Sequence, residues 1–331
     1  MKVLITDYVW PDVEIERSIL AAVGAELVVA PDGSEPTLAR LAVDCDAIMT
    51  CFARVTPAVL QAATRCVHVA RYGIGVDNIA VDEATELGIA VTNVPAFCVD
   101  EVAEHTLGLL LACARKIPLY NRATHAGRWD NLMGRPIFRV AGSTLGIVGF
   151  GKIGRSLAQK ASGLRLRILV HDPALAPGDS SADGVDVVDL ETLLRESDFV
   201  SLHLPLTPET RGLIGEAALR TMKPTAFLLN TSRGAVVDTA ALARALREGW
   251  IAGAGLDVMP EEPPSLDDPL LGMETLILTP HASFYSEQSL RELQTRAAEE
   301  VARVLGGRKP LHLVNPGVLP RARAPHLREK G

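Results

Sequence analysis

The sequence has no long apolar run and few aromatic residues, which make up 4% of the chain. Its longest apolar stretch, residues 107–114, is far shorter than the roughly 20 residues that a membrane-spanning helix needs. The N-terminus, MKVLITD, enters a strand-like run directly, so no secretory signal is expected. We therefore expect no membrane segment and no membrane partner.

Cysteine and positive charge are also scarce. The five cysteines, at positions 45, 51, 66, 98 and 113, are odd in number and form no C-x-x-C pair. This usage fits reduced thiols in a cytoplasm better than a disulfide framework, and we expect no metal site. A net charge of −7 argues against broad nucleic-acid binding, which needs a basic face. An anionic substrate must therefore find local positive charge.

What the chain does contain is an alternation of short β-branched runs with amphipathic stretches. A length of 331 residues favours two domains. Strands separated by helices predict βαβ units and parallel sheets, so the expected fold class is α/β with two parallel-sheet domains. The strands expected in the first domain are residues 2–7, 26–30, 46–50, 67–71 and 89–93, with helices expected over 12–23, 37–43, 57–63 and 79–87.

A second series follows a long helix that is expected from about residue 99 to Lys116 and a loop that contains Trp129. Its expected strands are residues 144–149, 167–172, 186–190, 199–204, 226–231, 253–258 and 276–280. A last helix is expected over 287–305, and the proline-rich tail after it should pack back on the first domain.

The segment GFGKIG places Gly149, Gly151 and Gly154 in a G-x-G-x-x-G array. The array follows an expected strand and opens a helix expected over 152–161, which is the context that a dinucleotide site requires. The first glycine makes the tight turn, the second lets the pyrophosphate approach the backbone, and the third packs helix on strand. The helix N-terminus then offers N–H groups to the phosphates.

The next expected strand ends in Asp172, eighteen residues beyond Gly154. A carboxylate there would accept hydrogen bonds from the adenine-ribose hydroxyls and repel a 2′-phosphate. No lysine or arginine follows it directly, because the next residues are Pro-Ala-Leu. The sequence therefore favours NAD over NADP.

Three expected strands of the second domain lead into Arg233, Asp257 and His281, with 24 residues from each to the next. In a doubly wound sheet, ligands bind at the carboxyl ends of the strands, so these residues should line the cofactor crevice together. Arg233 can hold a carboxylate bidentately. His281 can transfer a proton, with Glu262 orienting its ring.

Each of these residues also has an ordinary structural interpretation. A lone histidine at a strand end is most often structural, an arginine after a strand is often only solvated, and Glu262 could belong to a polar turn. The joint occurrence of a guanidinium, a carboxylate and an imidazole beside a dinucleotide turn favours a functional set.

The chain resembles the D-isomer-specific 2-hydroxyacid dehydrogenase family along essentially its whole length. The branches closest in motif are the C-terminal-binding proteins and the phosphoglycerate dehydrogenases. The resemblance rests on seven segments in order: RYGIGVDNI (71–79), AVTNVP (90–95), VDEVAEHTLGLLL (99–111), GFGKIG (149–154), LNTSRGAVVD (229–238), GAGLDVMPEEP (253–263) and TPH (279–281).

The resemblance implies a flavodoxin-like substrate domain, residues 1–98 with 287–331, and a Rossmann NAD-binding domain, residues 99–286. It implies a homodimer joined through the nucleotide domain, and an NAD-dependent enzyme that transfers hydride between nicotinamide C4 and C2 of a small 2-oxo or 2-hydroxy acid.

The family's site residues carry over to matching positions. Arg233 would bind the substrate carboxylate together with the backbone N–H groups of Ile74 and Gly75, Glu262 would pair with His281, and His281 would act as general acid and base. Cofactor contacts are implied for Thr106, Gly149, Gly151, Lys152, Ile153, Gly154, Asp172, Leu204, Pro205, Thr210, Thr231, Ser232, Arg233, Asp257, His281 and Ser283.

Two segments depart from common family patterns. His281 is followed by ASFYSEQ rather than by small residues, as in the C-terminal-binding proteins, so Phe284 either lines the substrate pocket or packs between domains. The stretch 49–54 lacks the arginine that phosphoglycerate dehydrogenases use for the substrate phosphate, although Arg54 or Arg71 could substitute.

The substrate therefore stays open among glyoxylate or hydroxypyruvate, a phosphorylated or phosphonate anion, and a bulkier apolar 2-oxo acid. The alternative from another class is an NAD(H)-responsive regulatory protein of the C-terminal-binding-protein type, since those proteins keep the same Arg, Glu and His.

Overall fold

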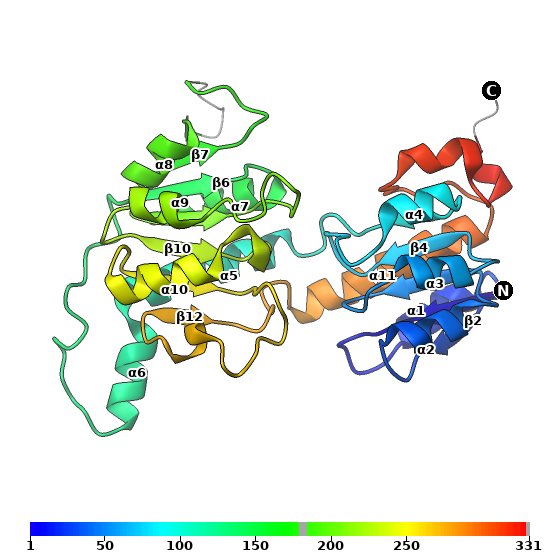
Figure 1. The fold of residues 1–331 in the computed structure, drawn as a ribbon, viewed down its shortest axis with the longest axis horizontal. Coiled ribbons are helices and arrows are strands. Elements are labelled where there is room, and N and C mark those ends of the chain that lie inside the picture. Colours follow the sequence, from blue (N-terminus) through cyan, green and yellow to red (C-terminus); the bar gives the residue numbers. More distant parts are fainter. Residues whose placement is uncertain (179–183, 329–331) are drawn as a thin grey trace. The chain divides into compact units, whose positions relative to one another are not determined.

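The computed structural model describes residues 1–178 and 184–328, and the chain forms two compact units (Figure 1). Unit 1 combines Met1–Phe97 with Ser286–Gly331, and unit 2 is Cys98–Tyr285. Each unit is a parallel β-sheet covered by α-helices. The predicted α/β class with two parallel sheets is confirmed.

Unit 1 is built on a five-stranded sheet in the order β2-β1-β3-β4-β5, with all neighbours parallel. This is the 2-1-3-4-5 order of flavodoxin-like folds. Strands β3, β4 and β5 have only buried residues, as expected where helices cover both faces. The strands are β1 (Lys2–Ile5), β2 (Glu26–Val29), β3 (Ala47–Thr50), β4 (His68–Arg71) and β5 (Ala90–Thr92).

The helices of unit 1 come from both ends of the chain. α1 packs on α11, which also contacts β3 and β4, while α2 packs on α3. The long helix α11 starts with a capping box formed by Ser286 and Ser289. The helices are α1 (Glu14–Ala21), α2 (Glu35–Ala42), α3 (Pro57–Ala62), α4 (Val81–Glu86) and α11 (Glu287–Leu305), and two 3-10 helices follow, η3 (Pro316–Arg321) and η4 (Pro325–Leu327).

The tail after α11 returns along β5. Val314 N–H donates to the Val91 carbonyl at 2.8 Å, and the Asn315 side chain accepts from Val91 N–H at 2.8 Å and donates to the Ile89 carbonyl at 3.0 Å. The prediction that the tail packs on the first sheet is therefore confirmed.

Unit 2 is built on a seven-stranded sheet in the order β12-β11-β10-β9-β6-β7-β8, again all parallel. Counted from β6, this is the doubly wound dinucleotide-binding order 3-2-1-4-5-6 with one more strand. The chain order reverses between β6 and β9. The strands are β6 (Thr144–Val148), β7 (Arg167–His171), β8 (Asp186–Val187), β9 (Phe199–Leu202), β10 (Phe227–Asn230), β11 (Gly253–Leu256) and β12 (Leu276–Leu278).

Helices cover both faces of this sheet and bury two separate apolar clusters. α5 and α7 share one cluster, while α9 packs on α8 and α10 over the other. Within residues 1–178 and 184–328, no helix is long and apolar enough to cross a membrane. The helices are α5 (Val99–Arg115), α6 (Ile117–His125), α7 (Lys152–Ser162), α8 (Leu190–Glu196), α9 (Glu216–Thr221) and α10 (Thr239–Glu248), with 3-10 helices η1 (Gly234–Val236) and η2 (Pro269–Gly272).

Helix α6 lies after Lys116, where a loop was expected. α5 ends at Lys116, whose left-handed backbone (φ 54°) turns the chain into α6. Pro118 lies in the first turn of α6, where its missing N–H costs nothing. Pro118 is the sequence feature that indicates the start of a second helix directly after Lys116.

A buried carboxylate connects α1 to the end of β4. Glu16 has no exposed surface, and the Tyr72 hydroxyl donates to its Oε1 at 3.0 Å. Burial raises the pKa of Glu16 above its usual 4.5, although the hydrogen bond from Tyr72 acts in the opposite direction. Because the native state holds this proton more tightly, the contribution of Glu16 to stability is fully present below pH 4.5 and is lost as pH rises through the folded pKa.

We therefore expect Glu16→Gln to raise the free energy of unfolding at pH 8 by about 1 kcal/mol, because Gln keeps an acceptor for Tyr72 without a buried charge. Below pH 4.5 the two proteins should be equally stable. Urea unfolding at both pH values measures this, with Glu14→Gln on the exposed side of α1 as control. A less stable variant at pH 8 would contradict the expectation.

Candidate active site

The three glycines after β6 have three different surroundings. A methyl group at Gly149, which has a φ of +94°, would overlap the His203 carbonyl, and one at Gly154 would overlap the carbonyl of Gly149. At Gly151 a methyl group would meet no atom within 4 Å among the described residues. The turn is therefore tight at its first glycine, open at its second and closely packed at its third, which fits a pyrophosphate at the start of α7.

Asp172 lies beside this turn. Its carboxylate accepts from Phe150 N–H at 2.8 Å and from Ala174 N–H at 2.9 Å. Lys152 and Ile153 form the first turn of α7. The structure therefore gathers the acidic residue and the residues of the glycine turn at the carboxyl ends of β6 and β7.

Two further groups of residues stand at neighbouring strand ends. After β9, the Thr210 hydroxyl donates to the Pro205 carbonyl at 2.7 Å, which closes the loop that Leu204 begins. After β10, the hydroxyls of Thr231 and Thr106 are 2.9 Å apart, so α5 contacts the end of this strand.

Ser232 and Arg233 follow Thr231 in a turn held by Asn230. The Asn230 Oδ1 accepts from the backbone N–H and the hydroxyl of Ser232, at 3.0 and 2.8 Å, and its Nδ2 donates to the Arg233 carbonyl at 2.9 Å. One Arg233 Nη donates to the Ser232 carbonyl at 2.8 Å. The guanidinium is thereby held close to the end of β10 and remains half-buried.

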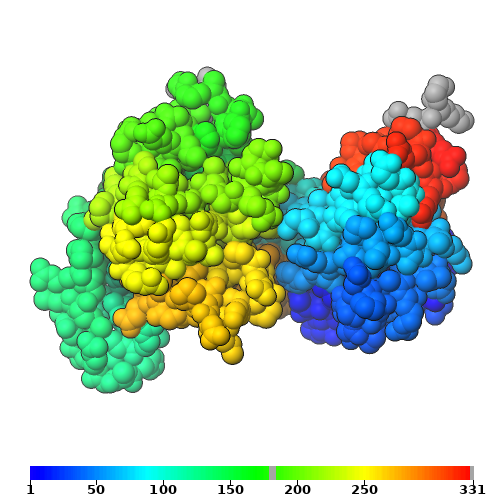
Figure 2. All heavy atoms as spheres, in the orientation of Figure 1, coloured from blue at the N-terminus to red at the C-terminus, as the bar shows by residue number. Residues whose placement is uncertain are grey.

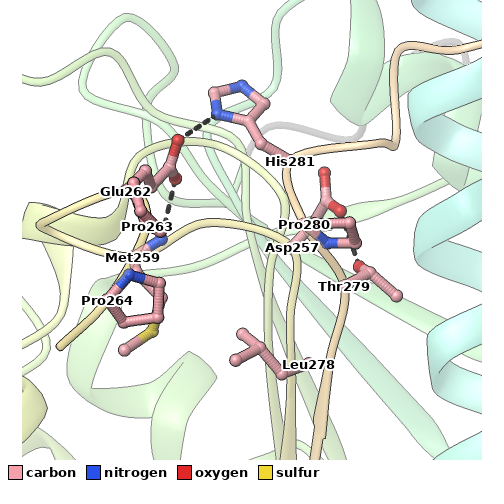
Figure 3. Close-up of a pocket in the computed structure, with 9 residues that line it drawn as sticks. All are labelled: Asp257, Met259, Glu262, Pro263, Pro264, Leu278, Thr279, Pro280 and His281. Atoms are coloured by element: carbon pink, nitrogen blue, oxygen red, sulfur yellow. Dashed lines mark hydrogen bonds and ion pairs between the residues drawn. The ribbon is translucent and has the colours of Figure 1, made fainter. Parts of the chain in front are cut away.

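His281 and Glu262 form a close pair (Figure 3). Their Nδ1 and Oε2 atoms are 2.7 Å apart, and the other carboxylate oxygen accepts from Met259 N–H at 2.9 Å. Because a carboxylate only accepts, His281 Nδ1 carries a proton, and Nε2 is the nitrogen whose protonation can change. The pair has the geometry of a general acid and base with an oriented ring.

The backbone of His281 is in the left-handed region, with φ 53°. Such a conformation costs a non-glycine residue about 1–3 kcal/mol and persists only where its surroundings fix it. Here His281 N–H donates to the Asp257 carbonyl at 2.7 Å. The Asp257 carboxylate, which has no exposed surface, accepts from the Thr279 hydroxyl at 2.6 Å, Ala282 N–H at 2.9 Å and Ser283 N–H at 2.8 Å.

Asp257 thus lies under the turn that carries His281 and holds it, a position that strand-end spacing alone does not reveal. Phe284 lies within the same unit, its ring edge-on to the His281 ring with the centroids 6.3 Å apart. Beside the His281–Glu262 pair is a pocket of about 390 Å³ with mostly apolar walls (Figure 3). It is lined by Asp257, Met259, Glu262, Pro263, Pro264, Leu278, Thr279, Pro280 and His281.

Ile74 and Gly75 belong to unit 1, in the loop after β4. The Gly73 carbonyl accepts from Val94 N–H at 2.9 Å, and the Ile74 carbonyl accepts from Asn93 Nδ2 at 2.6 Å. In a trans peptide the C=O and the next N–H point in opposite directions. The N–H groups of Ile74 and Gly75 therefore both point away from residues 93–94 and form a cradle of the kind that can bind an anion.

Several residues that hold the site residues in place were not predicted from the sequence. Asn93, Asn230 and Gly234 lie inside motif segments, but nothing in their chemistry singled them out. His105 on α5 was also missed: its Nε2 lies 3.0 Å from the Thr279 hydroxyl and 3.6 Å from Asp257 Oδ1.

The glycine turn, the doubly wound sheet and the paired imidazole and carboxylate together define a dinucleotide-dependent dehydrogenase. Residues 107–283 match the family model of the D-isomer specific 2-hydroxyacid dehydrogenase NAD binding domain. The chain belongs to this family and is an NAD-dependent oxidoreductase that acts on the CH–OH group of 2-hydroxy acids.

Similar proteins include enzymes named for glyoxylate, D-3-phosphoglycerate and D-lactate. A glyoxylate reductase of Korarchaeum cryptofilum is 44% identical over 88% of each chain. A D-3-phosphoglycerate dehydrogenase of Methanocaldococcus jannaschii is 37% identical over 99% of this chain and 62% of its own length. A structure of Aquifex aeolicus D-lactate dehydrogenase with NAD and lactic acid has a TM-score of 0.85 at 26% identity, over 93% of this chain and 96% of that one.

Gly234 gives the site a testable packing constraint. A methyl group there would overlap the peptide between Met259 and Pro260, three residues before Glu262. We expect Gly234→Ala to displace the Glu262 loop and to lower kcat about tenfold, because small misplacements of catalytic groups are costly.

Steady-state kinetics with a 2-oxo acid measures this effect. Gly272→Ala is the matched control, because a methyl group there meets no described atom within 4 Å. Equal kcat values for the two variants would show that the Gly234 packing does not position the pair.

Proposed function

We propose that this enzyme works mainly as a reductase of small 2-oxo acids, with His281 as the proton donor. The observation that carries the proposal is the 2.7 Å bond between His281 Nδ1 and Glu262, which orients the ring and assigns proton exchange to Nε2. When bound, NADH supplies the hydride to C2 of the substrate. His281 gives a proton to the C2 oxygen in reduction and takes it back in oxidation.

The remaining roles concern binding. Arg233 is proposed to bind the substrate carboxylate with its guanidinium. The cradle of Ile74 and Gly75 is proposed to bind the same carboxylate through its N–H groups, which makes unit 1 the substrate domain, residues 1–98 with 287–331. Phe284 is proposed to add apolar surface beside the C2 substituent, which its contact with the His281 ring supports.

Residues 99–286 are proposed to bind NAD along the carboxyl ends of β6, β7, β9 and β10. The surroundings of Gly149, Gly151 and Gly154 support a pyrophosphate at α7. Asp172, fixed by Phe150 N–H, is proposed to bind the ribose hydroxyls. The other proposed contacts are Thr106, Lys152, Ile153, Leu204, Pro205, Thr210, Thr231, Ser232, Arg233, Asp257, His281 and Ser283.

The direct test is NADH oxidation at 340 nm with a panel of 2-oxo acids: glyoxylate, hydroxypyruvate, pyruvate and 3-phosphohydroxypyruvate. Glyoxylate and hydroxypyruvate are the first expected substrates, because a 44% identical relative is a glyoxylate reductase. We expect His281→Gln to lower kcat by roughly 10²–10⁴, since it removes the proton donor. Arg233→Gln should mainly raise KM for the 2-oxo acid.

Arg40→Gln, which changes an exposed arginine on α2, is the control and should leave both constants unchanged. Negligible turnover of every substrate, combined with tight NADH binding, would overturn the reductase and favour the NAD(H)-responsive regulator instead.

A homodimer is also proposed, as the family resemblance implies. Four large apolar side chains are exposed on α6 and the segment after it: Ile117 at 54%, Trp129 at 92%, Leu132 at 57% and Phe138 at 60%. Figure 2 shows this segment gathered at one side of unit 2. Exposed apolar surface of this kind marks contact sites in proteins, and a second copy of the same segment would cover it.

We expect the double change Trp129→Asp and Phe138→Asp to convert a dimer into a monomer, since each places a charge in the contact. Light scattering after size exclusion measures the mass. Leu266→Asp is the control, because Leu266 is 93% exposed on a different loop of unit 2. A wild-type mass of one chain would overturn the proposal.

A cytoplasmic location is proposed as well. All five cysteines are buried thiols outside any disulfide, which suits a reducing compartment.

A further inference from the structure

His105 stands outside the proposed set of catalytic and binding residues, yet it contacts the centre of the site. It is the seventh residue of α5, and its side chain is 26% exposed. Its Nε2 is 3.0 Å from Thr279 Oγ1 and 3.6 Å from Asp257 Oδ1. His105 and Thr279 are 174 positions apart in the sequence, so only the fold brings them together.

The direction of these hydrogen bonds follows from counting protons. Thr279 has one hydroxyl proton, and the close Asp257 Oδ1, at 2.6 Å, can only accept it. Thr279 Oγ1 must then accept from His105, so His105 Nε2 carries a proton. The chain runs from His105 N–H to Thr279 and from Thr279 O–H to the buried Asp257 carboxylate.

Asp257 in turn closes the turn that contains His281. It accepts from Ala282 and Ser283 N–H through its carboxylate and from His281 N–H through its carbonyl. His281 is in the left-handed region, so its direction depends on these anchors. A shift of the Asp257 carboxylate therefore moves the residue that pairs with Glu262.

Helix α5 is a rigid support for this chain. It packs on β10 and β11, and the residue after His105, Thr106, is bonded to Thr231 at the end of β10. One helix thus holds the end of β10 through Thr106 and the end of β12 through His105.

We propose that His105 is a positioning residue whose Nε2–H, acting through Thr279 and Asp257, fixes the turn that directs His281 toward the substrate. The proposal rests on the proposed acid–base role of His281. Because His105 acts through His281, its loss impairs proton transfer and leaves the binding of the 2-oxo acid unchanged.

The test compares His105→Leu, which has no donor, with His105→Gln, whose side-chain amide can donate from nearly the same position as Nε2. We expect His105→Leu to lower kcat about tenfold without changing KM for the 2-oxo acid, as small misplacements of a catalytic group do. His105→Gln should restore most of kcat. Gln61→Leu, on the exposed side of α3, is the control.

A double-mutant cycle tests the chain itself. Thr279→Val removes the middle link, so the double variant with His105→Leu should be no slower than the slower single variant, because both changes break one connection. The imidazole NMR signals of His281, recorded without substrate, should shift in His105→Leu and return toward the wild-type position in His105→Gln.

The NMR comparison separates this proposal from the proposed function. An unshifted His281 signal in His105→Leu overturns the positioning role whether or not the protein turns over a 2-oxo acid. Additive losses in the cycle, or equal kcat for the Leu and Gln variants, overturn it as well. If the wild-type protein turns over no 2-oxo acid but the His281 signal still shifts in His105→Leu, only the proposed reductase activity is contradicted.

Discussion

The carboxylate of Asp257 is the group on which the geometry of the candidate active site depends. It is fully buried, and a buried carboxylate is tolerated only where donors surround it. Its donors are the Thr279 hydroxyl and the N–H groups of Ala282 and Ser283, all within the turn around His281. The cost of burying one charge is thereby offset by bonds that hold a strained histidine in one conformation.

The rest of unit 2 extends this arrangement through close packing. Gly234, next to Arg233, permits the peptide of Met259 and Pro260 to lie against its Cα, and that segment carries Glu262 to His281. The Arg233 guanidinium, the Glu262 carboxylate and the His281 imidazole follow three different strands. The close backbone contact at Gly234 sets the spacing between the first two of these segments. In unit 1, the Asn93 side chain and the Val94 N–H hold two carbonyls so that two N–H groups face the other way.

The sequence predicts those features whose signal is local. The strands were predictable because apolar β-branched runs alternate with amphipathic segments, and the glycine turn because its pattern lies between a strand and a helix. The inward position of Asp257 was not predictable because it depends on how the turn 279–283 folds over the end of β11. The contact of His105 with Thr279 was not predictable because it depends on how α5 lies on the sheet. Helix α6 was missed because the expected helix stops at Lys116 and the residues after it were expected to form a loop.

The division of unit 1 between the two ends of the chain has a consequence for biosynthesis. The residues of unit 2 are contiguous, whereas Met1–Phe97 need α11 and the returning tail, in which Asn315 bonds to Val91 across 224 positions. Domains generally fold as units as they leave the ribosome. Residues 1–97 are therefore translated before unit 2 but completed after it, and unit 2 can fold while the sheet of unit 1 still lacks α11 and the tail that pairs with β5.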